Sequence, residues 1–209
     1  MDSRSHWENV YETKKADQVS WFKPHLSKSL GLILEAGIKK NDPVIDVGGG
    51  ASTLADDLLR EGFTDITVLD ISSQSLEVTK KRLGKESSKI HWLVDDITTA
   101  NLPKGRYALW HDRAVFHFLT KSEDRKKYVT IMNQSLKPQG TAIIATFSLK
   151  GPERCSGLDI VRYSAETLQA ELGKNYHRMK SLEESHDTPF GTKQEFIYCV
   201  FKRQMGEKL

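Results

Sequence analysis

Residues 43–52 of the chain, PVIDVGGGAS, join an apolar strand to a helix through three consecutive glycines. Val44, Ile45 and Val47 predict a buried strand, and the stretch ASTLADDLLREG that follows the glycines predicts a helix. Glycine permits backbone conformations that are closed to other residues, and it lets a ligand lie against the free N–H groups at a helix N-terminus. We therefore predict a ligand-binding turn at this point of the chain.

A second strand, ITVLD, ends on Asp70, which lies 20 positions after Gly50. A carboxylate at this distance stands at the tip of the next parallel strand, where it can accept hydrogen bonds from both hydroxyls of a ribose. The two strands together therefore indicate a ligand that contains a nucleoside.

Strand and helix patterns alternate along the rest of the chain. We expect strands at 43–48, 65–70, 89–95, 107–111 and 141–149, and helices at 4–13, 25–38, 51–61, 73–83, 113–119, 122–136 and 164–173. Short links between alternating elements predict a parallel sheet with helices on both faces. The last two strands, near 176–184 and 195–202, are separated by a loop too short for a crossover, so they are expected to be antiparallel.

The predicted fold class is therefore α/β: one Rossmann-like domain with a seven-stranded, mostly parallel sheet and an antiparallel C-terminal strand. We assign residues 41–209 to this domain and residues 1–40 to a helical, aromatic segment that precedes it. A length of 209 residues is typical of one domain with a sizeable core.

Composition narrows the class of protein. The mean hydropathy is −0.50, and no apolar run approaches the roughly 20 residues of a membrane span. Cys155 and Cys199 make neither a disulfide framework nor a metal site, which indicates a reducing compartment. The net charge of +3 does not favour nucleic acid as a partner. We expect a monomeric, cytoplasmic protein without a membrane segment.

Ligands of open α/β sheets bind outside the carboxyl ends of the strands, so the residues at these ends are the candidates for a site. They are Asp46, Gly48, Gly49, Gly50, Asp70, Ile71, Asp95, Asp96, Ile97, His111, Asp112, Arg113, Phe147 and Ser148.

Three of the acidic candidates admit more than one interpretation. Asp46 either ties down the glycine turn or orients a cationic ligand. Asp96, or its neighbour Asp95, either accepts a hydrogen bond from an adenine amine or caps the next segment. Asp112 either holds a cationic amine or substrate, or it pairs with Arg113 or caps the helix that follows.

Aromatic residues are concentrated before the sheet, at Trp7, Tyr11, Trp21 and Phe22. They form either a small core packed on the helix at 25–38 or a lid whose aromatic face closes over a cationic cofactor, with Trp21 in contact with it. A cation–π contact of this kind contributes roughly 0.5–2 kcal/mol.

Four motifs in order, VIDVGGG, LD, VDDI and WHDRA, with an antiparallel final strand, resemble the class I S-adenosylmethionine-dependent methyltransferases over about residues 40–202. The resemblance implies that S-adenosylmethionine is the cofactor and S-adenosylhomocysteine the product. It implies that Gly48 and Gly50 pass the methionine moiety, that Asp70 binds the ribose, and that Asp96 and Ile97 bind the adenine. The chain departs from the family in reading GGGAS where G-x-G-T-G is common, but Ala and Ser are also small.

The methyl acceptor is less well defined. The lead HWENVY…VSWF is similar to the openings of small protein-lysine methyltransferases, whereas DRAVFHFLTKSEDRKKYVTIM is similar to a substrate-side segment of thiol and thiopurine methyltransferases. We expect transfer to a small-molecule nucleophile such as a thiol, with a protein lysine as the alternative. The expected catalytic residues are Asp112, Arg113 and His117, and no metal is expected because the spacing of His111 and His117 does not suit two ligands on one helix face.

A nicotinamide-dependent oxidoreductase is the competing class. Gly48 and Gly50 fit its glycine fingerprint, but the third glycine would fall at Thr53. Asp46 inside the first strand and the antiparallel ending also argue against this class.

Overall fold

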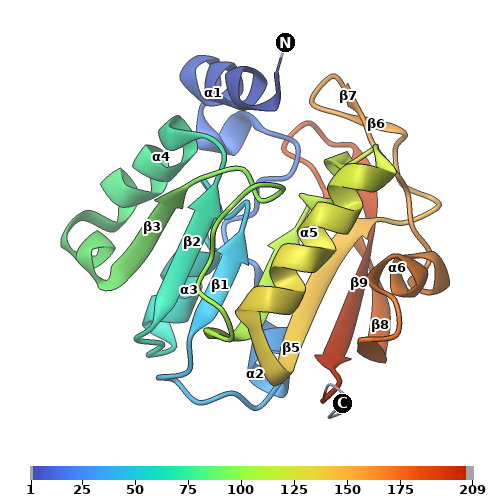
Figure 1. Ribbon diagram of the computed structural model, residues 1–209. Coiled ribbons are helices and arrows are strands. Elements are labelled where there is room, and N and C mark those ends of the chain that lie inside the picture. The colour runs from blue at the N-terminus through green and yellow to red at the C-terminus, as the bar shows by residue number, and fades with distance from the viewer. Residues whose placement is uncertain (1, 206–209) are drawn as a thin grey trace.

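The computed structural model of the protein describes residues 2–205, built around a seven-stranded sheet with helices on both faces (Figure 1). In spatial order the strands are β3 (Ile90–Val94), β2 (Ile66–Asp70), β1 (Val44–Val47), β4 (Tyr107–Arg113), β5 (Leu136–Phe147), β9 (Lys193–Arg203) and β8 (Tyr176–Asp187). Strand β9 runs antiparallel to both of its neighbours, and the other strands point the same way. The predicted fold class is confirmed.

Five helices cover the two faces of the sheet and form two cores. Helices α2 (Ser27–Glu35), α3 (Leu54–Arg60) and α4 (Ser73–Leu83) contribute to one core. Helices α5 (Ser122–Ser135) and α6 (Ala165–Leu172) contribute to the other, on the face turned toward the viewer in Figure 1. Burial of apolar side chains in these two cores stabilises the fold at roughly 25 cal/mol per Å² of apolar area.

Helix α1 (Ser3–Thr13) lies across the carboxyl ends of the strands, beside α4 (Figure 1). The chain then passes through a short 3₁₀ turn, η1 (Ala16–Gln18), before it reaches α2. Residues 2–26 therefore lie over the edge of the sheet where ligands of this fold bind.

The remaining elements are short. Two 3₁₀ helices, η2 (Gly84–Lys89) and η3 (Phe116–Phe118), follow α4 and β4, and the strands β6 (Arg154–Cys155) and β7 (Leu158–Asp159) form a small hairpin. The hairpin was not expected from the sequence. None of the helices within residues 2–205 is long and apolar enough to cross a membrane.

The helix predicted at 113–119 is wrong: the structure has only the 3₁₀ turn η3 there. Ala114 adopts a positive φ of 72°, and the carboxylate of Asp112 accepts hydrogen bonds from the N–H groups of Val115 and Phe116. These bonds turn the chain sharply and replace the first turn of an α-helix. The predicted helix at 51–61 likewise begins later, at Leu54.

Asp46 of β1 and Asp112 of β4 point to opposite faces of the sheet. Side chains of a strand point to alternate faces of the sheet. Asp46 therefore lies on the face covered by α2, where it meets His111, while Asp112 lies on the opposite face, where it meets Tyr128 of α5. The two carboxylates therefore have different surroundings.

Candidate active site

The turn after β1 has no space for side chains. Gly48 has a φ of 68°, and a Cβ added there would clash with Val115. A Cβ on Gly49 would lie 2.5 Å from Oδ2 of Asp46, and one on Gly50 would lie 2.5 Å from Oδ2 of Asp70. The three glycines therefore let two carboxylates and the backbone come together at the same point, which a larger residue would prevent.

Asp46 is 2% exposed, and its Oδ1 atom lies 2.7 Å from Nδ1 of His111. The Nε2 atom of His111 lies 2.9 Å from Oγ of Ser29. Among the described residues, Oδ2 of Asp46 has no hydrogen-bond partner. The N–H groups of Gly48 and Gly49 donate to the carbonyl of Leu69, so Asp46 does not tie down the turn through them. A buried carboxylate oxygen without a partner is costly, and a cationic ligand would relieve that cost.

Asp70 ends β2 at the wall of the cavity. Its Oδ1 atom accepts a hydrogen bond of 2.9 Å from the N–H group of Ser72. Burial raises the pKa of Asp70 to about 6. A carboxylate held in this way, with lone pairs left free, can accept hydrogen bonds from the two hydroxyls of a ribose.

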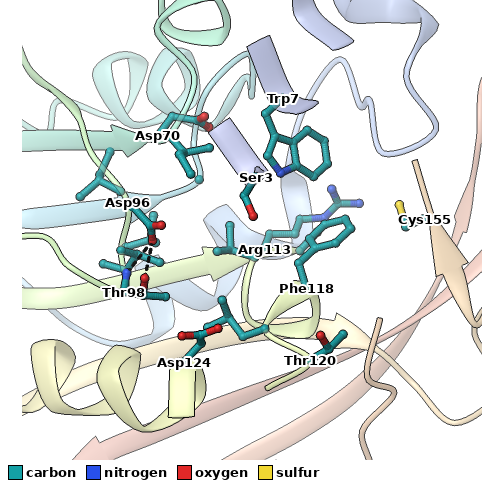
Figure 2. Close-up of a pocket in the computed structure, with 18 of the residues that line it drawn as sticks. Ser3, Trp7, Asp70, Asp96, Thr98, Arg113, Phe118, Thr120, Asp124 and Cys155 are labelled. Atoms are coloured by element: carbon teal, nitrogen blue, oxygen red, sulfur yellow. Dashed lines mark hydrogen bonds between the residues drawn. The ribbon is translucent and has the colours of Figure 1, made fainter. Parts of the chain in front are cut away.

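A cavity of about 300 Å³ opens at the carboxyl ends of the strands, with acidic residues at one end (Figure 2). Ile71, Asp95, Asp96, Ile97 and Thr98 line that end. Asp96 accepts hydrogen bonds of 2.8 Å from both the N–H group and the hydroxyl of Thr98 through Oδ1. Asp95 accepts one of 2.8 Å from the N–H group of Asp96. Among residues 2–205 the Oδ2 atom of neither carboxylate accepts a hydrogen bond, so the choice between them stays open.

The other end of the cavity is aromatic. Phe118, Phe147 and Phe196 line it together with Trp7 and Trp21 of the N-terminal segment. The ring of Trp7 lies edge-on to Trp21 at 5.6 Å and to Phe118 at 5.0 Å between centroids. The aromatic residues of the N-terminal segment therefore contribute to the wall of the cavity.

Helix α1 is held in place by Glu8. Its carboxylate accepts hydrogen bonds from the hydroxyl of Ser72 at 2.7 Å and from the N–H groups of Ser73 and Gln74, at 2.8 and 3.1 Å. Burial raises the pKa of Glu8, but these hydrogen bonds outweigh that effect and hold the pKa below its ordinary value. The carboxylate thereby satisfies free N–H groups at the N-terminus of α4, immediately after Asp70 and Ile71.

Arg113 lies where the main cavity meets a second cavity of about 40 Å³ beside the glycine turn, which His111 also lines. Its Nε donates to the hydroxyl of Tyr198 at 3.0 Å and its Nη1 to the carbonyl of Trp21 at 3.1 Å. The guanidinium carbon lies 4.5 Å from the centroid of the Phe196 ring. Among the described residues its buried Nη2 has no hydrogen-bond partner.

Two members of the expected catalytic set, Asp112 and His117, line neither of the two cavities. Both carboxylate oxygens of Asp112 are occupied, because Oδ1 accepts from Val115 and Oδ2 accepts from Phe116 and from the hydroxyl of Tyr128. Burial raises the pKa of Asp112 to about 6. The surroundings of Asp112 are those of a residue that holds the turn after β4.

His117 is also enclosed by protein. Its Nδ1 accepts a hydrogen bond of 3.2 Å from the N–H group of Phe147. Burial lowers the pKa of His117 to about 3, so the ring is neutral. Within residues 2–205 no three His, Cys, Asp or Glu side chains come together as a metal site would require.

Residues 44–140 match the family model described as a methyltransferase domain. EEF1A lysine methyltransferase 2 of Danio rerio is 25% identical over an alignment of 160 residues that covers 70% of this chain and 69% of that protein. A solved structure from a study of the conversion of a disulfide bond into a thioacetal group during echinomycin biosynthesis superposes with a TM-score of 0.77 at 15% identity, covering 99% of this chain and 95% of that one.

A second solved structure is the 1,6-didemethyltoxoflavin-N1-methyltransferase of Burkholderia thailandensis with bound 1,6-didemethyltoxoflavin and S-adenosylhomocysteine. It superposes with a TM-score of 0.74 at 15% identity, covering 97% of this chain and 87% of that one. At 15% sequence identity, these superpositions show that the folds are alike.

The strand order, the antiparallel β9 and the glycine turn define the class I methyltransferase fold. Together with the match of residues 44–140 to a methyltransferase domain, they make the chain similar to the methyltransferases that use S-adenosylmethionine as their cofactor. The residues present fit this cofactor, because the glycine turn admits a ligand against the backbone and the unpartnered Oδ2 of Asp46 suits its positive charge.

Proposed function

We propose that the protein methylates a small-molecule nucleophile, such as a thiol, that has an apolar or aromatic body. The observation that carries this proposal is the aromatic end of the cavity. Phe118, Phe147 and Phe196 form its walls, and Trp7 and Trp21 lie across it. An enclosure of this kind contacts a compact ring or apolar chain on several sides, and it leaves little room for a bulky partner.

The cofactor would occupy the cavity from its acidic end to the glycine turn. Asp70 would accept hydrogen bonds from the ribose hydroxyls, and Asp95 or Asp96 would accept one from the adenine amine. The side chains of Ile71 and Ile97 would pack against the adenine ring. Their place in the wall of the cavity supports these roles.

The methionine moiety would lie along Gly48, Gly49 and Gly50. Oδ2 of Asp46 would face its ammonium group, and His111 would fix the orientation of that carboxylate through the hydrogen bond to Oδ1. Trp21 would close the cofactor site from the N-terminal side, since it lines both cavities.

Bound S-adenosylmethionine supplies a methyl group on a positively charged sulfur. The chain contributes by holding the acceptor atom in line with that group, and alignment alone can account for about 7–11 kcal/mol of a reaction barrier. Of the segment 1–40, the part that precedes α2 would act as the lid that excludes water during transfer. Residues 41–209 would form the methyltransferase domain together with α2, which packs in one of its cores. Glu8 of α1 accepts four hydrogen bonds from Ser72, Ser73 and Gln74 of the domain. These bonds hold the lid against the domain and support this division.

Transfer of a radioactive methyl group into cell extract tests the acceptor class. The extract is separated into protein and small molecules after reaction with the full-length protein. The proposal expects label in the small-molecule fraction, and label confined to protein would contradict it.

A protein lysine is the second candidate, and the relationship to EEF1A lysine methyltransferase 2 favours it. A lysine amine must lose a proton before it attacks, so that reaction needs a route for the proton. Label that follows the protein fraction and is recovered as methyl-lysine after hydrolysis would establish this second candidate.

A further inference from the structure

The charge of Arg113 is not matched by a carboxylate at the aromatic end of the cavity. Within residues 2–205 no carboxylate oxygen lies within ion-pair distance of its guanidinium. The neighbouring carboxylate of Glu184 binds Lys23 at 2.5 Å and accepts a hydrogen bond of 3.0 Å from the hydroxyl of Tyr198. The hydroxyl of Tyr198 therefore stands between Glu184 and Arg113. Burial raises the pKa of Glu184, but its contacts with Lys23 and, more weakly, the charge of Arg113 hold that pKa below its ordinary value.

The guanidinium points away from the acidic end of the cavity. It bonds to Tyr198 and stacks on Phe196, and both residues belong to β9. The glycine turn follows β1, which lies on the other side of β4 in the sheet. Figure 2 shows the guanidinium beside Phe118 and below Trp7, toward Cys155 and away from Asp70 and Asp96. The guanidinium thus lies at the aromatic end of the cavity, and its buried Nη2 has no hydrogen-bond partner among the described residues.

Asp124 also lines the cavity, and its carboxylate pairs with Lys127 at 3.2 Å. Two other ionisable side chains of the lining, those of Cys155 and Tyr11, are poor bases. Burial raises the pKa of the Cys155 thiol to about 11 and raises the pKa of Tyr11 further above its ordinary value. Both groups are therefore protonated at neutral pH and cannot take a proton from an acceptor. A lysine ammonium would in addition be repelled by the guanidinium of Arg113.

We propose that Arg113 binds the acceptor atom in its ionised form, so that the substrate is a small aromatic or apolar thiolate or phenolate. This inference rests on the proposed function and names the chemical class of its acceptor. A guanidinium in an apolar surrounding stabilises an anion by charge-assisted hydrogen bonding, while the aromatic walls contact the rest of the molecule.

The transfer of the methyl group needs no base, because the ionised acceptor has no proton to lose. The ionised sulfur or oxygen forms a bond to the methyl carbon as the bond from that carbon to the cofactor sulfur breaks. The electron pair of the broken bond stays on the cofactor sulfur, which becomes a neutral thioether. No proton is released, and the methylated product carries no charge at the reacting atom, so its attraction to Arg113 is lost and its release is favoured.

The test uses 4-nitrophenol, whose phenolate absorbs visible light and whose phenol form does not. The full-length protein is first loaded with S-adenosylhomocysteine, and the bound probe is then titrated with pH. We expect the pKa of the bound probe to fall by about one unit, which corresponds to about tenfold tighter binding of the phenolate than of the phenol. Arg113→Met should abolish the shift, and Arg113→Lys should retain part of it.

The matched control is Arg162→Met. Arg162 also donates to backbone carbonyls, those of Leu149 and Gly151, but it lines neither cavity. This variant should keep the wild-type shift. In a parallel turnover assay with S-adenosylmethionine, 4-nitrothiophenol should be methylated and N-acetyl-lysine amide should not.

An unshifted or raised probe pKa in the wild-type protein, failure of the probe to bind, or an equal shift in Arg113→Met would each overturn the inference. These results are distinct from a failure of the proposed function, which would show as label confined to protein in the extract assay. Methylation of N-acetyl-lysine amide in preference to 4-nitrothiophenol would also overturn the inference.

Discussion

Nδ1 of His111 lies 2.7 Å from Oδ1 of Asp46, and the two residues are paired across the neighbouring strands β1 and β4. The imidazole is held on its other side by the hydroxyl of Ser29, 2.9 Å from Nε2. One oxygen of the carboxylate is thus occupied within the protein, while the other faces the glycine turn without a partner among the described residues. The pair fixes the direction of a negative charge at the point where a cationic cofactor would lie.

Asp46→Asn should therefore weaken cofactor binding more than it weakens the fold. The amide oxygen can still bond to His111, but the negative charge is lost. We expect the Kd for S-adenosylmethionine to rise by at least about tenfold, since a charge-assisted interaction contributes roughly 1.5–3 kcal/mol. Calorimetry measures the Kd, and Ser29→Ala is the control, which should lower the free energy of unfolding without a comparable change in Kd. Equal effects of both variants on the Kd would contradict this role of Asp46.

Asp70→Ala should raise the Kd for S-adenosylmethionine by at least tenfold, because the ribose would lose its hydrogen-bond acceptors. Asp65→Ala is a matched control, since Asp65 precedes β2 at its opposite end and pairs with Arg106. Burial raises the pKa of Asp70 to about 6, so the ionised form is lost as the pH falls through that value. The affinity of the wild-type protein should accordingly fall below about pH 6. A Kd for S-adenosylmethionine that is unchanged in Asp70→Ala would contradict the proposal that Asp70 binds the ribose.

The local motifs predicted the parts of the site that lie near one another in sequence. Gly48 and Asp70 could be recognised because a strand, a tight turn and the next strand tip follow each other within a short stretch. The contribution of Phe196 to the cavity wall could not be recognised from the sequence, because it depends on the antiparallel pairing of Phe147 with Phe196 across β5 and β9. Glu8 was missed for a similar reason: its partner Ser73 is 65 positions away, and the sequence around Glu8 carries no sign of it.

Asp112 shows another limit of sequence reasoning. His111 and Asp112 are adjacent in sequence and therefore point to opposite faces of the sheet. The sequence does not determine which of them faces the ligand. In the structure His111 reaches Asp46 beside the glycine turn, whereas Asp112 is enclosed by Tyr128 and the turn of η3.

Asp112→Asn should lower stability and leave cofactor affinity almost unchanged. The amide has only one acceptor oxygen for the N–H groups of Val115 and Phe116 and the hydroxyl of Tyr128, and a lost buried hydrogen bond costs about 1–3 kcal/mol. Urea unfolding measures the free energy of unfolding. A Kd raised as strongly as in Asp70→Ala, with stability unchanged, would instead support contact with the ligand.

The pH dependence of stability gives a second measurement on Asp112. Burial raises its pKa in the folded protein to about 6, above the ordinary value of 3.8. Between these values the folded protein retains a proton that the unfolded chain releases. The contribution of Asp112 to the free energy of unfolding is therefore greatest below about pH 4 and falls as the pH rises through 6. Asp112→Asn should lose this part of the pH dependence, and Asp95→Asn, a change of a half-buried residue at the acidic end of the cavity, should keep it.

Glu8→Ala should release α1 from the cofactor site. Glu8 accepts hydrogen bonds from Ser72, Ser73 and Gln74, and no other side chain of α1 makes comparable contacts with α4 within the part of the chain that the structure describes. We expect the amides of α1 to exchange with solvent faster in Glu8→Ala, and the Kd for S-adenosylmethionine to rise by about tenfold as Trp7 leaves the cavity wall. Hydrogen-exchange mass spectrometry and calorimetry measure the two effects. Glu12→Ala, an exposed position on the same helix, is the control and should change neither. Faster exchange with an unchanged Kd would mean that α1 packs on the domain without closing the cofactor site.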